Sequence, residues 1–104
     1  MDLQLISPTE LDNLLATSSP PLLIDLRDDD DYLKGHIPGA RWVCRQNCLK
    51  RITAMARQQG RPVVLYCYHG GVSMMLCRDL QDLGCPATSL CGGFESWKYV
   101  HRKQ

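Results

Sequence analysis

Six cysteines stand out in this chain of 104 residues, and one of them, Cys67, precedes residues that could activate it. Cys67 follows an apolar segment and begins a loop that contains the adjacent glycines Gly70 and Gly71. Glycine can adopt positive φ angles, and successive N–H groups that turn inward bind anions. A helix that starts after such a loop adds partial positive charge. We therefore expect a lowered pKa for the Cys67 thiol, which would make it a nucleophile at neutral pH.

A buried core cysteine is the alternative interpretation of Cys67, because free cysteine is among the most buried residue types. The segment before it, residues 63–66, is short, apolar and rich in β-branched residues, which is typical of a buried strand. A helical pattern follows over residues 73–83. Ligands of open α/β sheets bind at the carboxyl ends of the strands. The position of Cys67 therefore favours a chemical role over a packing role.

The rest of the chain supplies the elements that would position this loop. Short apolar segments predict strands at residues 3–6, 22–26, 41–43, 63–66 and 87–90. Helical patterns alternate with them, starting after Ser7, at residues 28–34, 46–59 and 73–83, and after Gly92 and Gly93. This alternation is typical of parallel α/β proteins. We expect an α/β fold with an open, mostly parallel five-stranded sheet and helices on both faces.

Particular residues mark where the helices begin and end. Ser7, Pro8 and Glu10 match a capping box with proline in the first turn, which predicts a helix start. Gly84 suits the position just after a helix end. The apolar residues at helical spacing, which we expect to be buried, are Leu11, Leu14 and Leu15 in the first helix and Leu76, Cys77, Leu80 and Leu83 in the helix after Cys67.

The length and charge of the chain limit the classes of function. A length of 104 residues suits a single domain over residues 1–104. The net charge of +1 argues against a strongly basic nucleic-acid binder, so we expect no nucleic-acid partner. The apolar runs are too short to span a membrane, and residues 1–4 do not begin a secretory signal. We therefore expect a cytoplasmic protein with no membrane partner.

The cysteine pattern bears on disulfides and metals. The six are Cys44, Cys48, Cys67, Cys77, Cys85 and Cys91. An even number would suit a disulfide framework in a secreted protein, but without a signal reduced thiols are favoured. The spacing lacks the paired Cys-x₂-Cys pattern of structural zinc sites, and His36 and His69 do not complete one, so we predict no metal site. One cysteine is then expected to be catalytic, with the others as fillers or helpers.

Four segments of the chain together resemble the rhodanese family, in particular its single-domain thiosulfate sulfurtransferases. The first is the loop Cys67-x-x-Gly70-x-x-Ser73 between a strand and a helix. The others are Leu-Ile-Asp-Leu-Arg at residues 23–27, Gly-His-Ile-Pro-Gly-Ala at residues 35–40, and Gly-Gly-Phe-x-x-Trp at residues 92–97. The four segments occur in the order of the family's motifs and extend along nearly the whole chain.

The resemblance implies a sulfurtransferase that needs no cofactor. Cys67 would attack the outer sulfur of thiosulfate or a similar donor, release sulfite and become a persulfide. Cyanide or a thiol, on a small molecule or a thioredoxin-like protein, would then accept that sulfur. The loop that binds the persulfide through its amides consists of Tyr68, His69, Gly70, Gly71, Val72 and Ser73. The Ser73 hydroxyl would either cap the following helix or donate to the sulfur.

The loop departs from the family pattern at one position, and other functions remain to be weighed. Many members carry an arginine where this chain has Val72, so the donor would be bound by amides, the helix dipole and His69 when protonated. A cysteine phosphatase or arsenate reductase needs an arginine at the sixth position after the cysteine, which is Ser73 here. A sulfur-carrying or regulatory binding module is the non-enzymatic alternative.

Three further residues are predicted to support the site. Arg27 is expected to pair with the acidic residues 28–31 or to brace the loop. Cys44 and Cys91 each follow a predicted strand, and we expect them on the same face of the sheet as Cys67. One of them could attack the persulfide and form an internal disulfide, and a packing role is the alternative for both. Residues 28–31 fit a solvated helix start better than a cation site.

Overall fold

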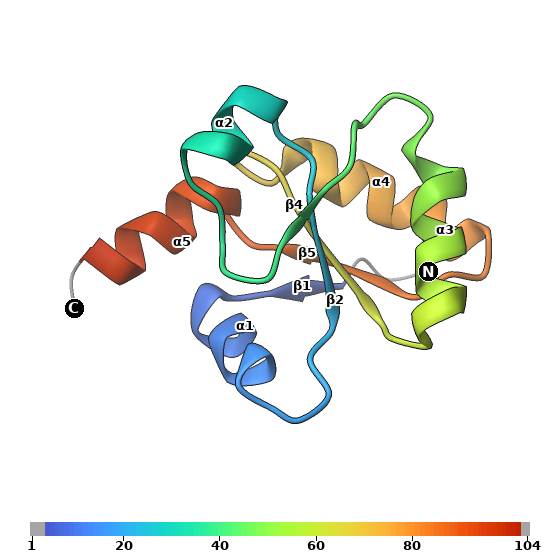
Figure 1. Cartoon of the computed structure of the whole chain (residues 1–104), viewed down its shortest axis with the longest axis horizontal. Helices are drawn as coiled ribbons and strands as arrows, with labels where there is room; N and C mark the ends of the chain where they lie inside the picture. The colour runs from blue at the N-terminus through green and yellow to red at the C-terminus, as the bar shows by residue number, and fades with distance from the viewer. Residues whose placement is uncertain (1–3, 103–104) are drawn as a thin grey trace.

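A computed structural model describes residues 4–102, and in this part strands and helices alternate along the chain (Figure 1). The strands are β1 (Leu5–Ile6), β2 (Leu22–Asp25), β3 (Arg41–Trp42), β4 (Val63–Tyr66) and β5 (Ala87–Leu90). The helices are α1 (Pro8–Leu15), α2 (Asp29–Lys34), α3 (Cys48–Gln59), α4 (Gly71–Asp82) and α5 (Gly93–Arg102). The predicted alternation is confirmed, although Leu3, expected in the first strand, lies outside the described residues.

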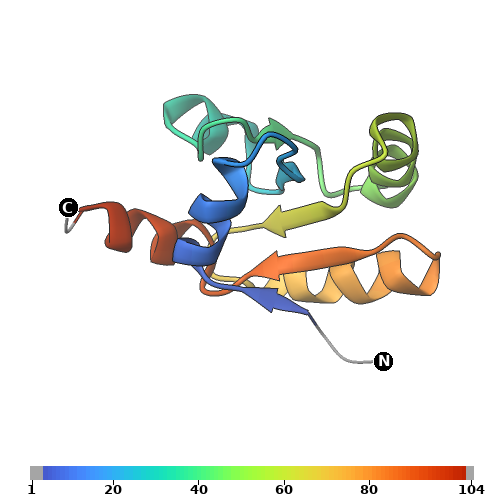
Figure 2. The same ribbon diagram turned by 90° about the horizontal axis from the view of Figure 1, so that it is seen from below.

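The described strands form one sheet in the order β1-β5-β4-β2-β3, and every neighbouring pair is parallel. Figure 2 shows the arrowheads of β1, β4 and β5 pointing the same way. Parallel strands place their carboxyl ends at one edge of the sheet, where such folds bind ligands. β4 lies between β5 and β2, so the next residue, Cys67, emerges at the middle of that edge.

Helices cover both faces of the sheet, as predicted, and each face has its own apolar core. One core joins the sheet to α3 and α4 and includes Ile24, Leu65, Ile52, Cys77 and Leu80. The other joins it to α1 and α5 and includes Leu23, Val64, Tyr66, Leu11 and the partly buried Phe94. The strands are therefore covered on both sides, which is the usual condition of a parallel sheet.

The helix boundaries follow their capping residues. Ser7 Oγ accepts a hydrogen bond from the Glu10 amide, and the Glu10 carboxylate accepts one from the Ser7 amide, both at 3.1 Å. The predicted capping box before Pro8 is therefore confirmed. α3 ends at Gly60 with a φ of 61°, and Gly84 after α4 has a φ of 78°. Both glycines allow the chain to leave a helix in a conformation that other residues rarely adopt.

Two leucines that were predicted to be buried are exposed. Leu14 is 41% exposed, because the short helix α1 meets the sheet through Leu11 and leaves Leu14 at the margin of the contact. Leu83 is 56% exposed, because α4 ends at Asp82 and the helical spacing does not continue. Periodicity identifies the apolar side of a helix, but it does not show how far the surface that covers this side extends.

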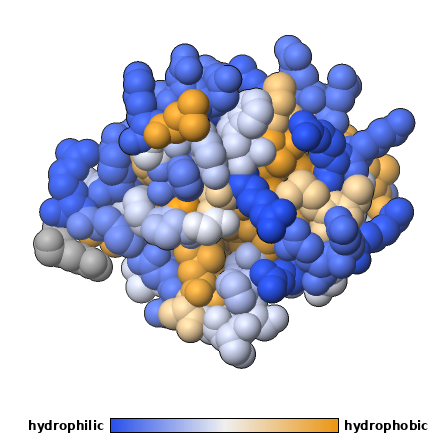
Figure 3. All heavy atoms as spheres, viewed as in Figure 1, coloured by the Kyte–Doolittle hydropathy of each residue, from blue (hydrophilic) through white to orange (hydrophobic). Residues whose placement is uncertain are grey.

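The outer surface is mainly hydrophilic on the face shown in Figure 3, with hydrophobic side chains visible between polar ones. Large exposed hydrophobic residues, such as Leu33 at 77% and Met75 at 59%, lie on different helices. Separate exposed apolar residues are normal on protein surfaces. Within residues 4–102, no helix combines the length and apolar character needed to cross a bilayer.

Candidate active site

Cys67 lies at the carboxyl end of β4 and begins a short loop that leads into α4. Only 5% of its surface is exposed. Its Sγ accepts hydrogen bonds from the amide of Gly70 at 3.2 Å and from the amide of Ser73 at 3.4 Å. Amide donors at a helix N-terminus favour a thiolate. The predicted arrangement is confirmed, and we call residues 67–73 the sulfur cradle.

The electrostatic balance at Cys67 favours the charged sulfur. Burial by itself raises the pKa of the thiol, because it disfavours the thiolate. The hydroxyl and amide of Ser73 act in the opposite direction, followed by the amides of Gly70 and Val72. These hydrogen bonds outweigh burial, and the pKa of Cys67 lies below the ordinary value for a cysteine. The direction expected from the sequence is confirmed.

Two buried serine hydroxyls lie next to the sulfur. Ser73 Oγ is 3.5 Å from Cys67 Sγ and 2.6 Å from Ser89 Oγ, and it donates to the Gly70 carbonyl at 3.2 Å. A hydroxyl donates one hydrogen bond and accepts up to two. When Cys67 is a thiolate, the Ser73 hydrogen can turn to the sulfur while Ser89 still donates to Ser73. Ser73 makes no side-chain cap of α4, so of the two predicted roles it adopts the contact with sulfur.

Ser89 was not predicted as part of the site. It is 0% exposed and lies in β5, the strand next to β4. A serine in an otherwise buried strand needs a hydrogen-bond partner, and this was the one sign of its role in the sequence. The partner is Ser73 on α4, and the sequence alone does not show that β5 lies beside β4.

Only one of the two loop glycines, Gly70, adopts the left-handed conformation that glycine allows. Gly70 has a φ of 107° and is the residue at which α4 begins. Gly71 is already helical and has no positive φ. The helix starts earlier than the predicted residue 73, because the change of backbone direction occurs at Gly70. Gly71 and Val72 are therefore in the first turn of α4, where amides have no partner within the helix.

The first turn of α5 contacts the sulfur cradle from another side. The amide of Phe94 donates to the Cys67 carbonyl at 2.9 Å, and the amide of Glu95 donates to the Tyr68 carbonyl at 3.2 Å. Gly93 has a φ of 64°, and a Cβ there would lie 2.6 Å from the carbonyl oxygens of Cys67 and Tyr68. This position has no room for a side chain. The Gly-Gly-Phe segment therefore brings the amides of α5 against the loop.

The other side chains of the sulfur cradle differ in their surroundings. The Tyr68 hydroxyl accepts a hydrogen bond from the Asp28 amide at 3.2 Å and donates to the Asp31 carboxylate of α2. His69 is exposed, and Val72 packs against the core under α3 and α4. Residues 67–73 thus contain no arginine or lysine. Negative charge at the sulfur is met by amides and hydroxyls.

Arg27 pairs with Asp25, and the expected pairing with residues 28–31 is wrong. Its Nη2 lies 2.8 Å from Asp25 Oδ2, with side-chain exposures of 4% and 0%. Nη2 also donates to the Gly35 carbonyl at 2.6 Å, and the guanidinium lies 3.9 Å from the centre of the Phe94 ring. Asp25 is the partner because it shares the burial of Arg27, whereas residues 28–30 are exposed. Through Phe94, Arg27 supports the helix that contacts the sulfur cradle.

The remaining cysteines occupy different positions. Cys91 follows β5, the neighbour of β4, and is exposed. Cys44 follows β3, which β2 separates from β4, and it is partly buried. Cys48, Cys77 and Cys85 are buried, as expected for packing residues. Burial raises the pKa of each of these three thiols, that of Cys77 to about 12. They are therefore poor nucleophiles at neutral pH.

The acidic residues 28–31 form the start of α2. Asp28 precedes the helix, and Asp29, Asp30 and Asp31 lie in its first turn. Negatively charged side chains at this end of a helix interact favourably with the helix dipole. This agrees with the predicted helix start. Among residues 4–102, no group of three or more histidine, cysteine, aspartate or glutamate side chains is placed to bind a metal ion.

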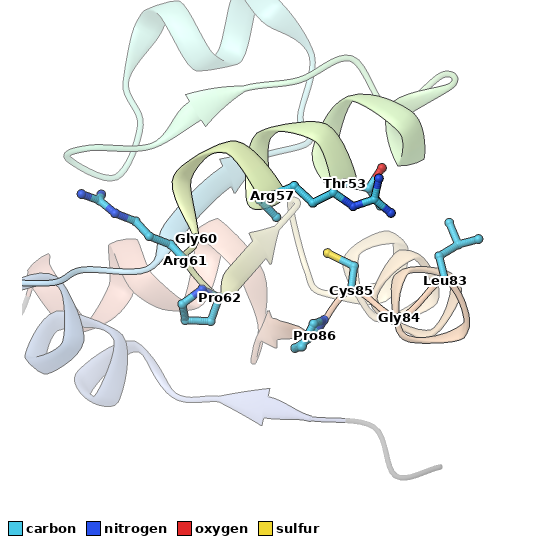
Figure 4. Close-up of a pocket in the computed structure, with 10 residues that line it drawn as sticks. Thr53, Arg57, Gly60, Arg61, Pro62, Leu83, Gly84, Cys85 and Pro86 are labelled. Carbon is cyan, nitrogen blue, oxygen red and sulfur yellow. The ribbon is translucent and has the colours of Figure 1, made fainter.

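A separate hollow of about 400 Å³ lies at the opposite edge of the sheet (Figure 4). It is formed by the C-terminal ends of α3 and α4 and by the segments that precede β4 and β5. Arg57 and Cys85 lie on facing sides of it. The residues that line it include none of the sulfur cradle, so this hollow is not where Cys67 meets a substrate.

The fold and the sulfur cradle define a class of parallel α/β proteins with a stabilised cysteine at the carboxyl end of a central strand. The chain belongs to the family of the Rhodanese-like domain, whose sequence model matches residues 7–99. The resemblance drawn from the four sequence segments is therefore confirmed. The match extends from the capping box of α1 into the last turns of α5.

Several relatives are named sulfurtransferases. The thiosulfate sulfurtransferase GlpE of Coxiella burnetii is 36% identical over 81 residues, which are 77% of this chain and 74% of that protein. A tRNA sulfurtransferase of Pyrobaculum aerophilum is 30% identical over 99 residues, and this chain spans only 20% of its length. The structure of a thiosulfate sulfurtransferase from Pseudomonas aeruginosa matches with a TM-score of 0.81 and 28% identity, over 96% of this chain and 19% of that one. Sulfur transfer is thus the activity named for these relatives.

Proposed function

We propose that the chain is a thiosulfate sulfurtransferase that works through a persulfide on Cys67. The observation that carries this proposal is the polar surround of Cys67 Sγ, which accepts hydrogen bonds from the amides of Gly70 and Ser73 and lies 3.5 Å from the Ser73 hydroxyl oxygen. These groups stabilise the thiolate that attacks and the anionic persulfide that results. The GlpE relatives, which this chain matches over most of their length, support thiosulfate as the donor.

The proposed first half-reaction loads the enzyme. The Cys67 thiolate attacks the outer sulfur of thiosulfate, a new S–S bond forms, and sulfite leaves with the electron pair of the broken bond. The dianionic donor needs positive partial charge near Cys67, since the sulfur cradle contains no lysine or arginine. The first turn of α4, with the amides of Gly71 and Val72, supplies it.

The proposed second half-reaction removes the outer sulfur from the Cys67 persulfide. The thiolate of a small thiol or of a thioredoxin-like protein, or cyanide in an assay, attacks the outer sulfur, and Cys67 leaves as a stabilised thiolate. No cofactor takes part in either step. Cys67 must be reduced for the cycle to start, so a reducing compartment, the cytoplasm, is the proposed setting.

The sulfur cradle does not favour the phosphatase or arsenate reductase alternative. Those reactions need a fixed cation that can make two hydrogen bonds to the transferred group. Ser73 takes the position where that arginine would stand, and its hydroxyl is committed to buried partners. The next arginine along the chain, Arg78, is exposed on α4.

The experiment that tests the proposal is intact mass spectrometry of the reduced protein after brief incubation with thiosulfate. We expect a gain of one sulfur atom on the wild type and none on Cys67→Ala. The matched control is Cys77→Ala, which removes a thiol from the neighbouring core and should still gain the sulfur. Absence of both a sulfur gain and any released sulfite or sulfide with the wild type, given thiosulfate or a polysulfide donor, would contradict the proposal.

Turnover separates an enzyme from a sulfur-carrying module. An enzyme should produce sulfite and thiocyanate repeatedly when thiosulfate and cyanide are both in excess. A carrier should take up sulfur once and then stop. Comparing thiosulfate with mercaptopyruvate in the same assay identifies the preferred donor.

A further inference from the structure

Cys67 and Cys91 each follow the last residue of a strand, and the two strands, β4 and β5, are neighbours in the sheet. Leu65 pairs with Ser89, and each cysteine lies two residues further along its chain. Residues two apart in a strand point to the same face of a sheet. Ser89 points to α4, where it contacts Ser73, so the strand pattern assigns Cys91 to the α4 face. Cys67 faces the same way, toward Gly70 and Ser73.

The backbone at Cys91 is in the turn that follows β5 and lies close to the sulfur cradle. The Cys91 amide donates to the Ile6 carbonyl at 2.8 Å, which continues the pairing of β5 with β1. A Cβ at Gly70 would lie 3.6 Å from the Leu90 carbonyl oxygen and 3.5 Å from the Gly92 nitrogen. Gly70 is also the residue whose amide binds Cys67 Sγ. One glycine therefore contacts both the reactive sulfur and the peptide groups that flank Cys91.

Exposure and strand order distinguish Cys91 from Cys44. Cys67 is buried, whereas Cys91 is exposed. Cys44 follows a strand that is not adjacent to β4, and its nearest cysteine along the chain is the buried Cys48. The pairing of β4 with β5 ends at Leu65 and Ser89, so Cys67 and Cys91 both follow directly after neighbouring strands, and a disulfide between them requires their Cα atoms to come within about 4.4–6.8 Å. Cys77 also lies near Cys67, in the same core, but it is buried, so Cys91 is the exposed cysteine that follows a strand adjacent to β4.

We propose that Cys91 resolves the Cys67 persulfide, which makes it a second catalytic residue. The Cys91 thiolate attacks Cys67 Sγ, and a disulfide forms between the two residues. The bond from Cys67 Sγ to the outer sulfur breaks, and that sulfur leaves as hydrosulfide with the electron pair. The two thiols are oxidised and the outer sulfur is reduced to sulfide, so no other oxidant is needed. This step rests on the proposed function, because it requires the persulfide.

The proposal also defines the class of partner. A disulfide between Cys67 and Cys91 must be reduced before another cycle, and a dithiol does this by forming its own disulfide. Cys91 is the accessible end of the pair, so the partner's thiolate first attacks Cys91 and releases Cys67 as the stabilised thiolate. The partner is therefore a protein dithiol of the thioredoxin kind. The products are sulfite, hydrosulfide and the oxidised partner.

The experiment compares wild type, Cys91→Ser and the matched control Cys44→Ser, each reduced and then given thiosulfate without any acceptor thiol. Free thiols are blocked with a maleimide before intact mass measurement, and released sulfide is measured in parallel. We expect wild type and Cys44→Ser to form a disulfide between Cys67 and Cys91, mapped by peptide analysis, and to release sulfide. Cys91→Ser should keep the sulfur on Cys67 and release at least about tenfold less sulfide.

The outcomes separate this inference from the proposed function. If no variant gains sulfur or releases sulfide, the proposed function itself fails. If wild type keeps its persulfide as stably as Cys91→Ser does, Cys67 transfers sulfur but Cys91 does not resolve it, and the inference is overturned. A loss of sulfide release in Cys44→Ser, with Cys91→Ser unaffected, would assign the role to Cys44 and equally overturn it.

Discussion

The charge state of Cys67 depends on a small number of hydrogen bonds. Its sulfur is nearly buried, and burial alone would hold it as a neutral thiol. Ser73 contributes both its amide and its hydroxyl to the sulfur, and Ser89 is bonded to that hydroxyl. A buried hydroxyl with a second donor behind it is better able to stabilise an anion. Removing the hydroxyl of either serine should therefore change the pKa of Cys67 measurably.

Ser73→Ala should raise the pKa of Cys67 by about one unit, since a net hydrogen bond contributes roughly 0.5–1.5 kcal/mol and one pKa unit equals about 1.4 kcal/mol. Ser89→Ala should cause a smaller shift in the same direction. The measurement is the pH dependence of iodoacetamide alkylation at the Cys67 peptide. A lowered pKa means that wild type reaches half of its maximal rate at a lower pH than an ordinary cysteine does, and that both variants need a higher pH than wild type.

Thr88→Ala provides the matched control for Ser89→Ala. Thr88 is the adjacent residue of β5, and its hydroxyl bonds to Gln4 rather than to the sulfur cradle. Its removal should leave the alkylation profile unchanged. An unchanged profile in Ser89→Ala as well would show that Ser89 only fills space beneath Ser73.

The reactive segment could be predicted from the sequence because Cys67, Gly70 and Ser73 lie within one short loop. Local spacing is enough to place an amide or a hydroxyl near a sulfur there. Ser89 could not be found in this way, since its contact with Ser73 depends on strand order. The partner of Arg27 was also missed, because choosing Asp25 over residues 28–31 requires knowing which carboxylate is buried.

The contact between α5 and the sulfur cradle is the feature at the element scale with the clearest consequence. Gly93 has backbone of Cys67 and Tyr68 directly where a Cβ would stand. Gly60 has nearly the same φ, 61° against 64°, but no atom lies within 4 Å of a Cβ built there. Alanine at either position would strain the backbone, but only alanine at Gly93 would also displace the loop, so comparing the two variants distinguishes these effects.

Gly93→Ala should raise the pKa of Cys67 and slow sulfur transfer, because the added methyl group pushes the α5 amides away from the loop carbonyls. Gly60→Ala should cost a comparable backbone strain, about 1–2 kcal/mol, without changing the pKa. The measurements are urea denaturation for stability and the alkylation profile for the pKa. Equal alkylation profiles in the two variants would contradict a positioning role for Gly93.

Helices and strands could be predicted where local signals mark them. Ser7 and Gly60 sit at the expected boundaries, and β4 was predicted with its observed bounds. The edge strands β1 and β3 are shorter than predicted, with two residues each, since an edge strand has only one neighbour to pair with. The order β1-β5-β4-β2-β3 arises from long-range packing that local spacing does not encode.

At the scale of the whole molecule, Arg27 and Asp25 join parts that are distant in sequence. The Arg27 guanidinium contacts the Gly35 carbonyl and the Phe94 ring, and the Arg27 carbonyl accepts a hydrogen bond from Trp42. These contacts connect the end of β2 with the segment after α2, with β3 and with α5. A buried charge pair in such a position has a large effect on stability when one partner is removed.

Arg27→Met should lower the free energy of unfolding by about 3–5 kcal/mol, because it leaves the Asp25 carboxylate buried without its cation. The double variant Asp25→Asn with Arg27→Met should lose less, since it removes the unpaired charge. Urea denaturation monitored by circular dichroism measures both. Lys98→Met is the control at an exposed pair and should change stability by less than about 1 kcal/mol. A loss for Arg27→Met no greater than for Lys98→Met would contradict the role given to the buried pair.

The order along the chain of the residues that contact the sulfur cradle has a consequence for protein synthesis. The ribosome releases Cys67 and its loop before Ser89, Phe94 and Glu95, whose hydroxyl and amides complete the surroundings of the loop. Domains fold as units while or after they are synthesised. A nascent chain that ends before β5 therefore has Gly70 and Ser73 near Cys67 in sequence but lacks the contacts from Ser89 and α5 that hold the loop in place. We therefore expect the proposed sulfur chemistry to reach its full rate only after β5 and α5 have been synthesised and the domain has folded.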